Sequence, residues 1–359
     1  MKNSPLSAKH EALGAKMADF GGWLMPIEYP GGGVLAEHDA VRNRVGIFDV
    51  SHLGKISVQG PGAKDFINSI LTNDLNKISN GEAQYNLLCN DAGGVIDDII
   101  AYRNSDDDIF LVPNAANCSK VFDVLTKSAP SQIKITNQHE EYAVIAVQGP
   151  RSKDLIESLG VTLGIDYMSF TRSQIAGCDV IVCRTGYSGE HGYEVLPKWG
   201  DASKVWDAIT AKLGDGLVCG LGARDTLRTE MGYPLHGQEL SESISASISG
   251  ASWAIAYEKE KFHGDNKLRA EKAAGAPRRL RGLKLLDRGI PRGHMQVFDG
   301  DKLVGETTSG TFSPTLKYGI ALGLIDSSYK LGDQLSIDVR GRKLAAEIVK
   351  LPMVQPHVK

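Results

Sequence analysis

A short sequence occurs twice in this chain of 359 residues and limits how the chain can fold. Val58-Gln59-Gly60-Pro61 is followed by the helix-like run 64–69, and Val147-Gln148-Gly149-Pro150 is followed by a similar run, 153–158, at the same spacing. Each copy predicts a strand that ends in a Gln-Gly-Pro turn, with the proline beside the start of an amphipathic helix, where its missing N–H costs little. The repeat therefore predicts two related α+β modules.

The size and composition predict a globular chain of two or three domains, long enough to be an enzyme. The net charge of −3 shows no positive excess that would favour nucleic acid or an anionic membrane as a partner. The five cysteines have no metal-ligand spacing, which favours unpaired structural thiols in a reducing compartment. The first residues are polar, and no apolar stretch reaches transmembrane length. We therefore expect a cytoplasmic protein without a metal site.

Strands and helices are predicted on both sides of the second copy. We expect strands over 95–102, 109–113 and 180–184, a turn at 104–107, and helices from 117 to about 127 and from about 202 to 212. The small and basic stretch 271–279 predicts a surface linker. The short strands expected after it, over 281–285, 294–298 and 334–339, favour a small antiparallel barrel or sandwich.

Two adjacent carboxylates stand in the strand expected over 95–102. Side chains alternate along a strand, so Asp97 shares a face with Ile99, whereas Asp98 shares the other face with Tyr102. A charge removed from water is paired, lies near an edge or is kept for chemistry. On these residues alone two interpretations stay open, a local structural pair and a functional carboxylate.

Two other runs could contact a ligand. The run 184–194 combines three glycines, two tyrosines, two acids and a histidine, which suits a flat amino-heterocycle such as a pterin or purine, or else forms a tight hairpin. Gly220–Asp225 lacks the sixth small residue of a dinucleotide fingerprint, so we reject that site. Instead we expect a helix with Asp225 in its first turn, with Arg224 or Arg228 offered to a ligand or held in an internal ion-pair network. The histidines His38, His52 and His191 lack ligand spacings and are expected in the core or at the surface.

Together these runs resemble one family, the aminomethyltransferase or T-protein of the glycine cleavage system. The resemblance rests on Phe20–Pro26, Phe48–Leu53, Leu71–Asp74, Gly93–Asp98, Arg184–Glu190, Gly222–Asp225 and Thr308–Pro314. It implies an α+β fold of three domains in a clover-leaf arrangement, in which two related α+β modules surround a central folate site and a C-terminal antiparallel β-barrel follows. The expected domains are a discontinuous first module of 1–50 and 138–270, a ferredoxin-like second module of 51–137 that carries Asp97, and a barrel of 278–359.

The resemblance also implies a reaction. Such enzymes receive an aminomethyl group on the lipoyl arm of the H-protein, release ammonia and pass the one-carbon unit to tetrahydrofolate as methylenetetrahydrofolate. We therefore expect tetrahydrofolate as the acceptor substrate, a lipoyl group supplied by a transiently bound H-protein, no metal, no flavin and a monomeric chain. Nucleic acid and membranes are not expected as partners.

The same resemblance assigns site residues. It implies that Asp97 is the catalytic carboxylate, acting through electrostatic positioning rather than as an obligate base. The residues that it implies for folate binding are Tyr187, Glu194, Arg224, Leu53, Tyr85, Ile99, Val112 and Trp253. Because Tyr102 shares the face of Asp98, we expect Asp98 to serve structure. The C-terminal end, 351–357, departs from the family pattern, because it lacks tyrosines that some members carry there.

Three alternatives remain. One is another folate-dependent demethylase of the same superfamily, although those that act on amines often carry a flavin domain that is not expected here. The second is a non-catalytic folate-binding assembly factor of iron–sulfur proteins, whose Lys-Gly-Cys-Tyr-type string does not occur in this chain. The third is a member that keeps the fold as a scaffold and has lost catalysis.

Overall fold

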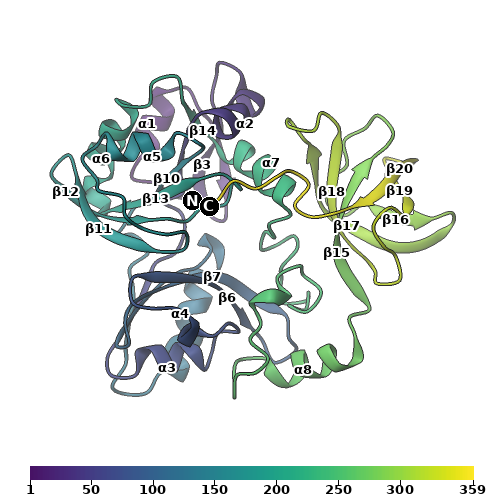
Figure 1. Ribbon diagram of the computed structural model, residues 1–359, viewed down its shortest axis with the longest axis horizontal. Coiled ribbons are helices and arrows are strands. Elements are labelled where there is room, and N and C mark those ends of the chain that lie inside the picture. The colour runs from purple at the N-terminus through teal and green to yellow at the C-terminus, as the bar shows by residue number, and fades with distance from the viewer.

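The computed structural model describes residues 1–359 and shows three lobes arranged around a centre (Figure 1). Two lobes are each built on a β-sheet flanked by helices, and the third is a closed six-stranded barrel. The predicted α+β clover-leaf fold with a C-terminal β-barrel is confirmed. None of the helices combines the length and the apolar character needed to cross a membrane.

The six-stranded sheet contains the second copy of the repeat. Its strand order is β11 (Phe170–Ile175), β12 (Cys178–Cys183), β13 (Gly192–Pro197), β10 (Ile145–Gln148), β4 (Gly46–Asp49) and β14 (Leu217–Cys219). Apolar side chains of α5 (Ser152–Glu157) and α6 (Ala202–Thr210) share a core with one face of this sheet. The same lobe holds α1 (Ser7–Ala12), α2 (Gly33–Asn43) and a small sheet of β1 (Lys2–Asn3), β3 (Trp23–Glu28) and β2 (Lys16–Phe20).

The five-stranded sheet contains the first copy of the repeat. Its strands are antiparallel, in the order β6 (Glu82–Cys89), β7 (Val95–Ser105), β8 (Asp108–Val112), β5 (Ile56–Gln59) and β9 (Lys134–Asn137). Helices α3 (Ala63–Asn68) and α4 (Cys118–Ser128) cover one face, where Ile67, Val121 and Ile99 share a core. We call this the α3/α4 core.

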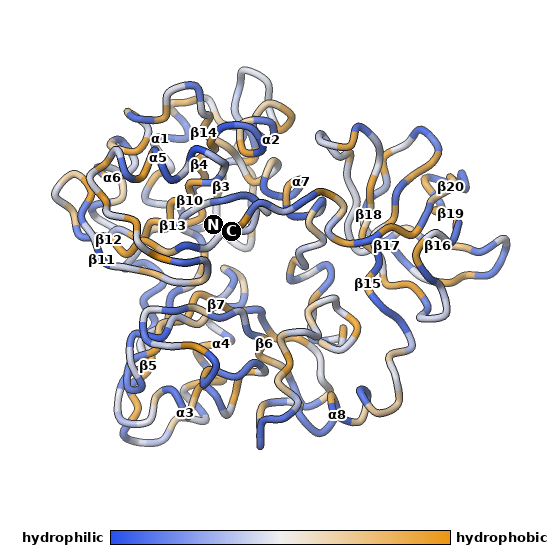
Figure 2. The backbone as a smooth tube through the Cα atoms, viewed as in Figure 1, coloured by the Kyte–Doolittle hydropathy of each residue, from blue (hydrophilic) through white to orange (hydrophobic).

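The faces of the two sheets that these helices leave open pack against each other. Phe48 and Ala146 from the six-stranded sheet meet Tyr102 and Phe110 from the five-stranded sheet, together with Leu227 of α7 (Leu221–Met231). We call this the inter-sheet core. Figure 2 shows hydrophobic stretches along β7 and β10, within the lobes, and mostly hydrophilic loops at the periphery. Strand β7 thus has one face toward the α3/α4 core and one face toward the other sheet, because side chains alternate along a strand.

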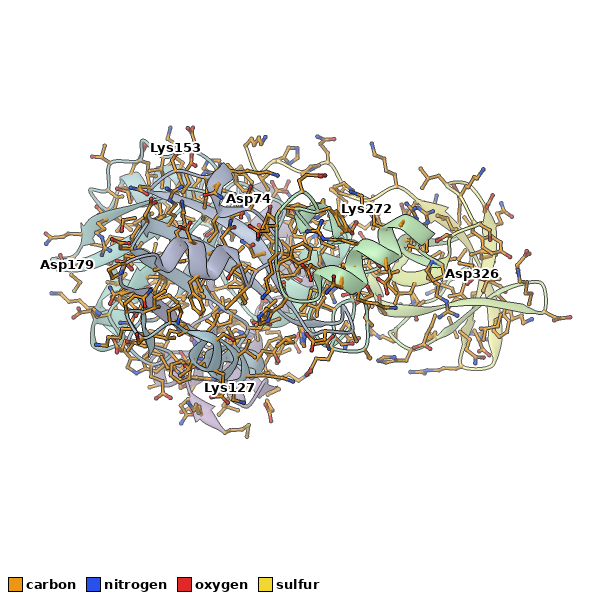
Figure 3. All side chains as sticks on the ribbon, turned by 90° about the horizontal axis from the view of Figure 1, so that it is seen from below. Asp74, Lys127, Lys153, Asp179, Lys272 and Asp326 are labelled. Carbon is orange, nitrogen blue, oxygen red and sulfur yellow. The ribbon has the colours of Figure 1, made fainter.

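The barrel follows the two sheets. Its order is β15 (Arg278–Leu285), β18 (Gly319–Asp326), β17 (Lys302–Phe312), β16 (Gln296–Asp299), β19 (Gln334–Val339) and β20 (Arg342–Val349), which pairs back to β15. Figure 3 shows the barrel, with Asp326, at one end of the molecule and Lys272 of α8 (Asp265–Ala274) between it and the sheets. Helix α7 contacts β17 and β18, so it joins the barrel to the rest of the chain.

The predicted elements are mostly confirmed. The strands predicted over 95–102, 109–113 and 180–184 are β7, β8 and β12, and the two predicted helices are α4 and α6. All five cysteines are buried and unpaired, as predicted. The linker prediction is wrong in part, because α8 continues to Ala274 through residues that favour helix and ends at Gly275, whose φ is +81°. Asp225 lies in the second turn of α7 rather than in the first, because the helix already begins at Leu221.

Candidate active site

Asp97 leaves β7 toward the α3/α4 core. Its carboxylate is completely buried on the same face as Ile99. It accepts hydrogen bonds from the Asn114 N–H at 2.9 Å, from Asn114 Nδ2 at 2.9 Å and from Asn117 Nδ2 at 2.7 Å. Burial, and then the charge of Asp98, raise the pKa of Asp97 well above its usual value, although these hydrogen bonds oppose the shift.

Asp98 leaves β7 toward the other sheet. It shares its face with Ile100, which packs against the inter-sheet core. The Tyr85 hydroxyl donates to its Oδ2 at 3.1 Å, and Asn114 Nδ2 donates to its Oδ1 at 2.7 Å. Burial raises the pKa of Asp98, and the electrostatic interaction with His236 is the largest of the effects that oppose it.

The two carboxylates leave opposite faces of β7, as the alternation predicts. The sequence places Asp97 toward the ligand and assigns Asp98 to structure, yet α3 and α4 cover the Asp97 face and the other sheet meets the Asp98 face. Alternation alone separates the two faces without saying which one is covered by helices. The catalytic role predicted for Asp97 is a separate matter and stays a prediction.

Tyr85 and Trp253 lie together beside Asp98. Their rings are stacked, with centroids 5.3 Å apart and planes at 25°. Trp253, in the 3-10 turn Ser252–Ala254, is 69% exposed. Burial raises the pKa of Tyr85, and the charges of Asp98 and then Tyr187 add to the shift. Two predicted folate-binding residues from distant parts of the chain therefore form one aromatic surface next to a carboxylate.

Tyr187 lies in the hairpin that joins β12 to β13. Its hydroxyl donates to the Pro234 carbonyl, and its ring carries the Arg224 guanidinium, 4.7 Å from the ring centroid. Arg228, one helical turn after Arg224, is instead held by ion pairs with Asp225 and Glu239. The internal network predicted as an alternative thus applies to Arg228, whereas the partner shown for Arg224 is an aromatic face.

Glu194 completes this side of the site. It is buried in β13, and its Oε2 accepts a hydrogen bond from the Thr185 hydroxyl. Burial lowers the pKa of Arg224, and the charges of Glu194 and then Tyr187 oppose that shift. The predicted residues Tyr187, Glu194 and Arg224 are therefore brought together, and an acceptor, a donor and an aromatic ring stand side by side.

The hairpin depends on close contact with Gln148. Gln148 Nε2 donates to the carbonyls of Thr185 and Tyr193 at 3.2 and 3.3 Å, and Ser188 Oγ donates to Gln148 Oε1 at 2.7 Å. A Cβ atom on Gly186 would lie 2.2 Å from Gln148 Oε1. Glycine at this position lets the hairpin backbone rest on the glutamine side chain.

The other residues predicted to line the folate pocket lie in two different cores. Leu53 and Val112 pack against the inter-sheet core, and Val112 is paired with Ile100 in the ladder. Ile99 is 1% exposed in the α3/α4 core and is not brought together with them. Sequence reasoning missed Ile100 and Asn114, and the alternation that links Ile100 to Asp98 was the signal for the first of them.

His52 follows the default expectation of a core histidine. It is 3% exposed, and its Nδ1 has no hydrogen-bond partner. Burial lowers the pKa of His52 to about 3, and Arg224 contributes to the shift. No group of three or more His, Cys, Asp or Glu side chains is arranged to hold a metal ion.

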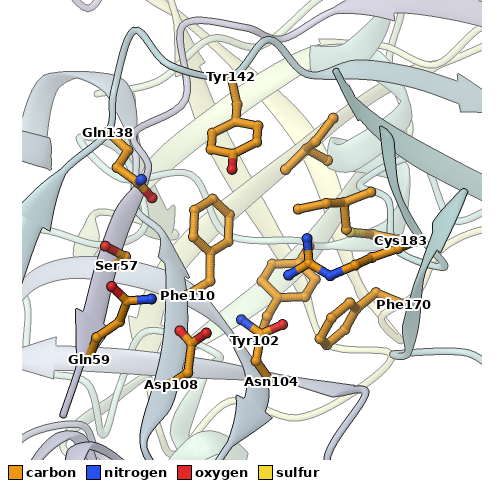
Figure 4. Close-up of a pocket in the computed structure, with 13 residues that line it drawn as sticks. Ser57, Gln59, Tyr102, Asn104, Asp108, Phe110, Gln138, Tyr142, Phe170 and Cys183 are labelled. Atoms are coloured by element: carbon orange, nitrogen blue, oxygen red, sulfur yellow. The ribbon is translucent and has the colours of Figure 1, made fainter. Parts of the chain in front are cut away.

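Two cavities beside the five-stranded sheet include no predicted site residue. The cavity in Figure 4, about 100 Å³, lies between the sheets and is lined by the rings of Tyr102, Phe110, Tyr142 and Phe170 with polar side chains at its rim. It is smaller than the roughly 300 Å³ at which ligand pockets begin. A larger one, about 520 Å³, lies by α3 and is lined mainly by polar side chains.

Comparison with known proteins matches nearly the whole chain to one family. The GCVT N-terminal domain family matches residues 6–259, and the glycine cleavage T-protein C-terminal barrel domain family matches residues 278–355. An aminomethyltransferase of Parafrankia sp. (strain EAN1pec) is 55% identical over 359 residues, which cover 99% of this chain and 98% of that protein. One of Mycobacterium tuberculosis (strain ATCC 25618 / H37Rv) is 54% identical, with 98% and 96% covered. The crystal structure of glycine cleavage system aminomethyltransferase T from Bartonella henselae superimposes with a TM-score of 0.92 at 31% identity, covering 99% of both chains.

Proposed function

The chain belongs to the glycine cleavage T-protein family, and from this premise we propose how its residues carry out aminomethyl transfer. It is an aminomethyltransferase that uses tetrahydrofolate as its acceptor substrate. The one-carbon unit comes from the S-aminomethyl group of the dihydrolipoyl arm on the H-protein. Its carbon exchanges bonds to nitrogen and sulfur for bonds to two folate nitrogens, and the two displaced folate protons end on ammonia and on the lipoyl sulfur.

The aromatic and charged side chains on the Asp98 side fit a reduced pteridine. Tyr187 and the Tyr85–Trp253 pair offer aromatic faces, Arg224 offers N–H donors, and Glu194 offers carboxylate oxygens to the amino groups of the ring. Leu53 and Val112 supply apolar contacts, and Ile100 stands where Ile99 was predicted. We assign folate binding to these residues.

The carboxylate chemistry belongs to the Asp97–Asp98 pair, with Asp98 as the member that faces the substrates. A negative group beside the reacting carbon stabilises the positive charge that develops as ammonia leaves, and it can accept the proton of a folate N–H. The single observation that supports this assignment best is the orientation of Asp98 beside Tyr85. Asp97, the residue predicted from the sequence, lies on the opposite face of β7. Comparison of Asp97→Asn with Asp98→Asn decides between the two residues.

The electron balance indicates that no flavin takes part. The carbon has the oxidation level of formaldehyde both between sulfur and nitrogen and between two nitrogens, so no electrons leave the substrates. The lipoyl group arrives on the H-protein, which binds transiently, and the chain acts as a monomer. The predicted domains, 1–50 with 138–270, 51–137 and 278–359, stay part of the same proposal.

The test is ammonia release from aminomethylated H-protein with and without tetrahydrofolate. We expect release to depend on folate and to yield methylenetetrahydrofolate with free lipoyl thiol. Folate binding without any turnover would support the non-catalytic assembly factor or scaffold and contradict this proposal. Methyl transfer from a sulfonium compound or a methylated amine, with no turnover of the H-protein substrate, would favour the demethylase alternative.

A further inference from the structure

Asn114 is the one side chain that contacts both carboxylates of β7. It follows β8 in an extended conformation, with φ −66° and ψ 151°. The ladder between β7 and β8 begins at the pair Ile100 and Val112, so Asn114 lies beyond the last pair, beside the part of β7 that carries Asp97 and Asp98. Because consecutive side chains leave opposite faces of a strand, a group at the strand edge is placed to reach both.

The contacts divide the donors of Asn114 between the two acids. Its Nδ2 donates to Asp98 Oδ1 at 2.7 Å and to Asp97 Oδ1 at 2.9 Å, and its backbone N–H donates to Asp97 Oδ2 at 2.9 Å. The amide carries two hydrogens, enough for one to each carboxylate, and Nδ2 also lies 3.2 Å from the Asp98 carbonyl oxygen. Asn117, by contrast, donates to Asp97 alone.

We propose that Asn114 is a positioning residue of the transfer reaction, which acts by fixing the Asp98 carboxylate toward the reacting folate nitrogen. This inference rests on the proposed function and adds a residue to it. One oxygen of Asp98 is held by Asn114 and the other by Tyr85, so the carboxylate cannot rotate and its remaining lone pairs keep one direction. Fixed orientation of this kind contributes to rate because the reacting groups start close to their transition-state geometry.

The Asn114 amide also helps Asp98 to stay ionised, because its hydrogen bond lowers the pKa of this buried carboxyl. The titratable groups that act on Asp98 are Asp97, which leaves the other face of the same strand, Tyr85 on β6 and His236 on the chain after α7, and Tyr187 lies beyond Tyr85. The hydrogen bonds to the two carboxylates come from neutral amide and phenol groups. Loss of the Asn114 amide therefore makes ionisation of Asp98 less favourable.

Asn114→Ala tests the inference, with Asn117→Ala as a matched control. Asn114→Ala should lower kcat about 10- to 100-fold, as expected for a misplaced catalytic group, while KM for tetrahydrofolate stays the same. The acidic limb of its kcat/KM profile should move to higher pH. Asn117→Ala also removes an amide donor from Asp97, and it should change kcat by less than about threefold with no shift of the limb.

Two further variants separate positioning from folding. Asn114→Ala in an Asp98→Asn background should lower kcat no further, because residues that act as a unit are not additive. Asn114→Ser, which keeps a hydroxyl donor, should recover part of the loss, and it replaces the alanine variant if that one does not fold. Equal losses at positions 114 and 117, an unchanged pH profile, or a full additional loss in the double variant would overturn the inference.

The wild-type assay separates this inference from the proposed function. A wild-type chain without folate-dependent ammonia release overturns both. A wild-type chain with that activity, together with an Asn114→Ala variant that matches it in kcat and pH profile, overturns only the role of Asn114.

Discussion

Gln59 and Gln148 occupy equivalent positions in the two copies of the repeat, but they differ in burial and in hydrogen bonding. Gln148 is 1% exposed and holds the hairpin that carries Tyr187 through three hydrogen bonds. Gln59 is exposed and lies at the rim of the cavity between the sheets (Figure 4). An identical local sequence thus supports the site in one module and meets solvent in the other.

The backbone of the repeat is the part that both copies share. Gly60 and Gly149 have φ values of +126° and +127°. A Cβ atom would lie 2.2 Å from the Gln132 carbonyl oxygen in one copy and 2.6 Å from that of Arg44 in the other. The repeat therefore specifies a strand, a turn and a helix, whereas the role of each side chain depends on what packs against it.

The same division extends to the candidate site. The five-stranded module supplies the carboxylate pair on β7, and the six-stranded module supplies Tyr187 and Glu194, with Arg224 on the helix that follows. We therefore expect variants of the carboxylate pair to change the rate of transfer, and variants of Gln148 and Arg224 to change the stability of the hairpin or folate binding.

The largest effect is expected at Asp98. Asp98→Asn keeps the volume and removes the charge, so kcat for methylenetetrahydrofolate formation should fall about 100- to 10,000-fold, the range of general acid–base catalysis. KM for tetrahydrofolate should change little. Asp65→Asn, at an exposed position of the same module, is the control and should behave like the wild type.

Asp97→Asn completes this comparison. Under the proposal that Asp98 faces the substrates, the variant at position 97 should lose less activity than the one at position 98. The opposite result, with transfer lost in Asp97→Asn and kept in Asp98→Asn, would support the role predicted from the sequence and contradict our assignment.

The next effect concerns the stability of the two copies. Gln148→Leu leaves the Thr185 and Tyr193 carbonyls and the Ser188 hydroxyl without their partner, so the free energy of unfolding should fall by about 2–4 kcal/mol. Gln59→Leu should change it by less than about 0.5 kcal/mol, as is usual for exposed positions. Urea denaturation measures both, and equal losses would show that the two copies do not differ in the way described.

A smaller effect is expected for folate binding. Arg224→Met removes the half-buried guanidinium that lies over Tyr187 and the N–H donors proposed for folate. A hydrogen bond from a charged donor contributes about 1.5–3 kcal/mol, so KM for tetrahydrofolate should rise about 10- to 100-fold. The exposed Arg172, on the six-stranded sheet, is the control, and Arg172→Met should leave KM unchanged. A fall in kcat at constant KM would contradict a role of Arg224 in folate binding and indicate a role in the chemical step.

The backbone of this molecule could be predicted from sequence far better than its contacts. Alternation along 95–102 separated Asp97 from Asp98, and the repeat predicted two modules with their turns and helices. The face of β7 that helices cover depends on α3 and α4, and the surface beside Asp98 joins Tyr85 to Trp253 from a distant part of the chain. The string Val-Gln-Gly-Pro is the same in both copies, so nothing local distinguishes Gln148 from Gln59.

The smallest effect is expected in the pH dependence of stability, where one proton changes the free energy of unfolding by at most about 1.4 kcal/mol per pH unit. Burial and the charge of Asp98 raise the pKa of Asp97 above its ordinary 3.8. The contribution of Asp97 to the free energy of unfolding is therefore fully present below pH 3.8 and is lost as the pH rises through the raised pKa. Glu230, near α2 and the barrel, has the opposite sign: burial alone would raise its pKa, but the hydrogen bond and charge of His38, with Arg42, hold it at about 2 instead of 4.5. Its contribution is therefore present above pH 4.5 and is lost as the pH falls toward 2.

Variants at Asp97 and Glu230 separate their opposite effects on how the free energy of unfolding changes with pH. Asp97→Asn should remove part of the decrease in stability above pH 4, and Glu230→Gln should flatten the increase between pH 2 and 4.5. Urea denaturation of the wild type and both variants at several pH values measures the slopes. If Asp97→Asn keeps the wild-type slope above pH 4, Asp97 is ionised in the folded chain at its ordinary pKa, and the charge on the carboxylate pair is not limited by burial.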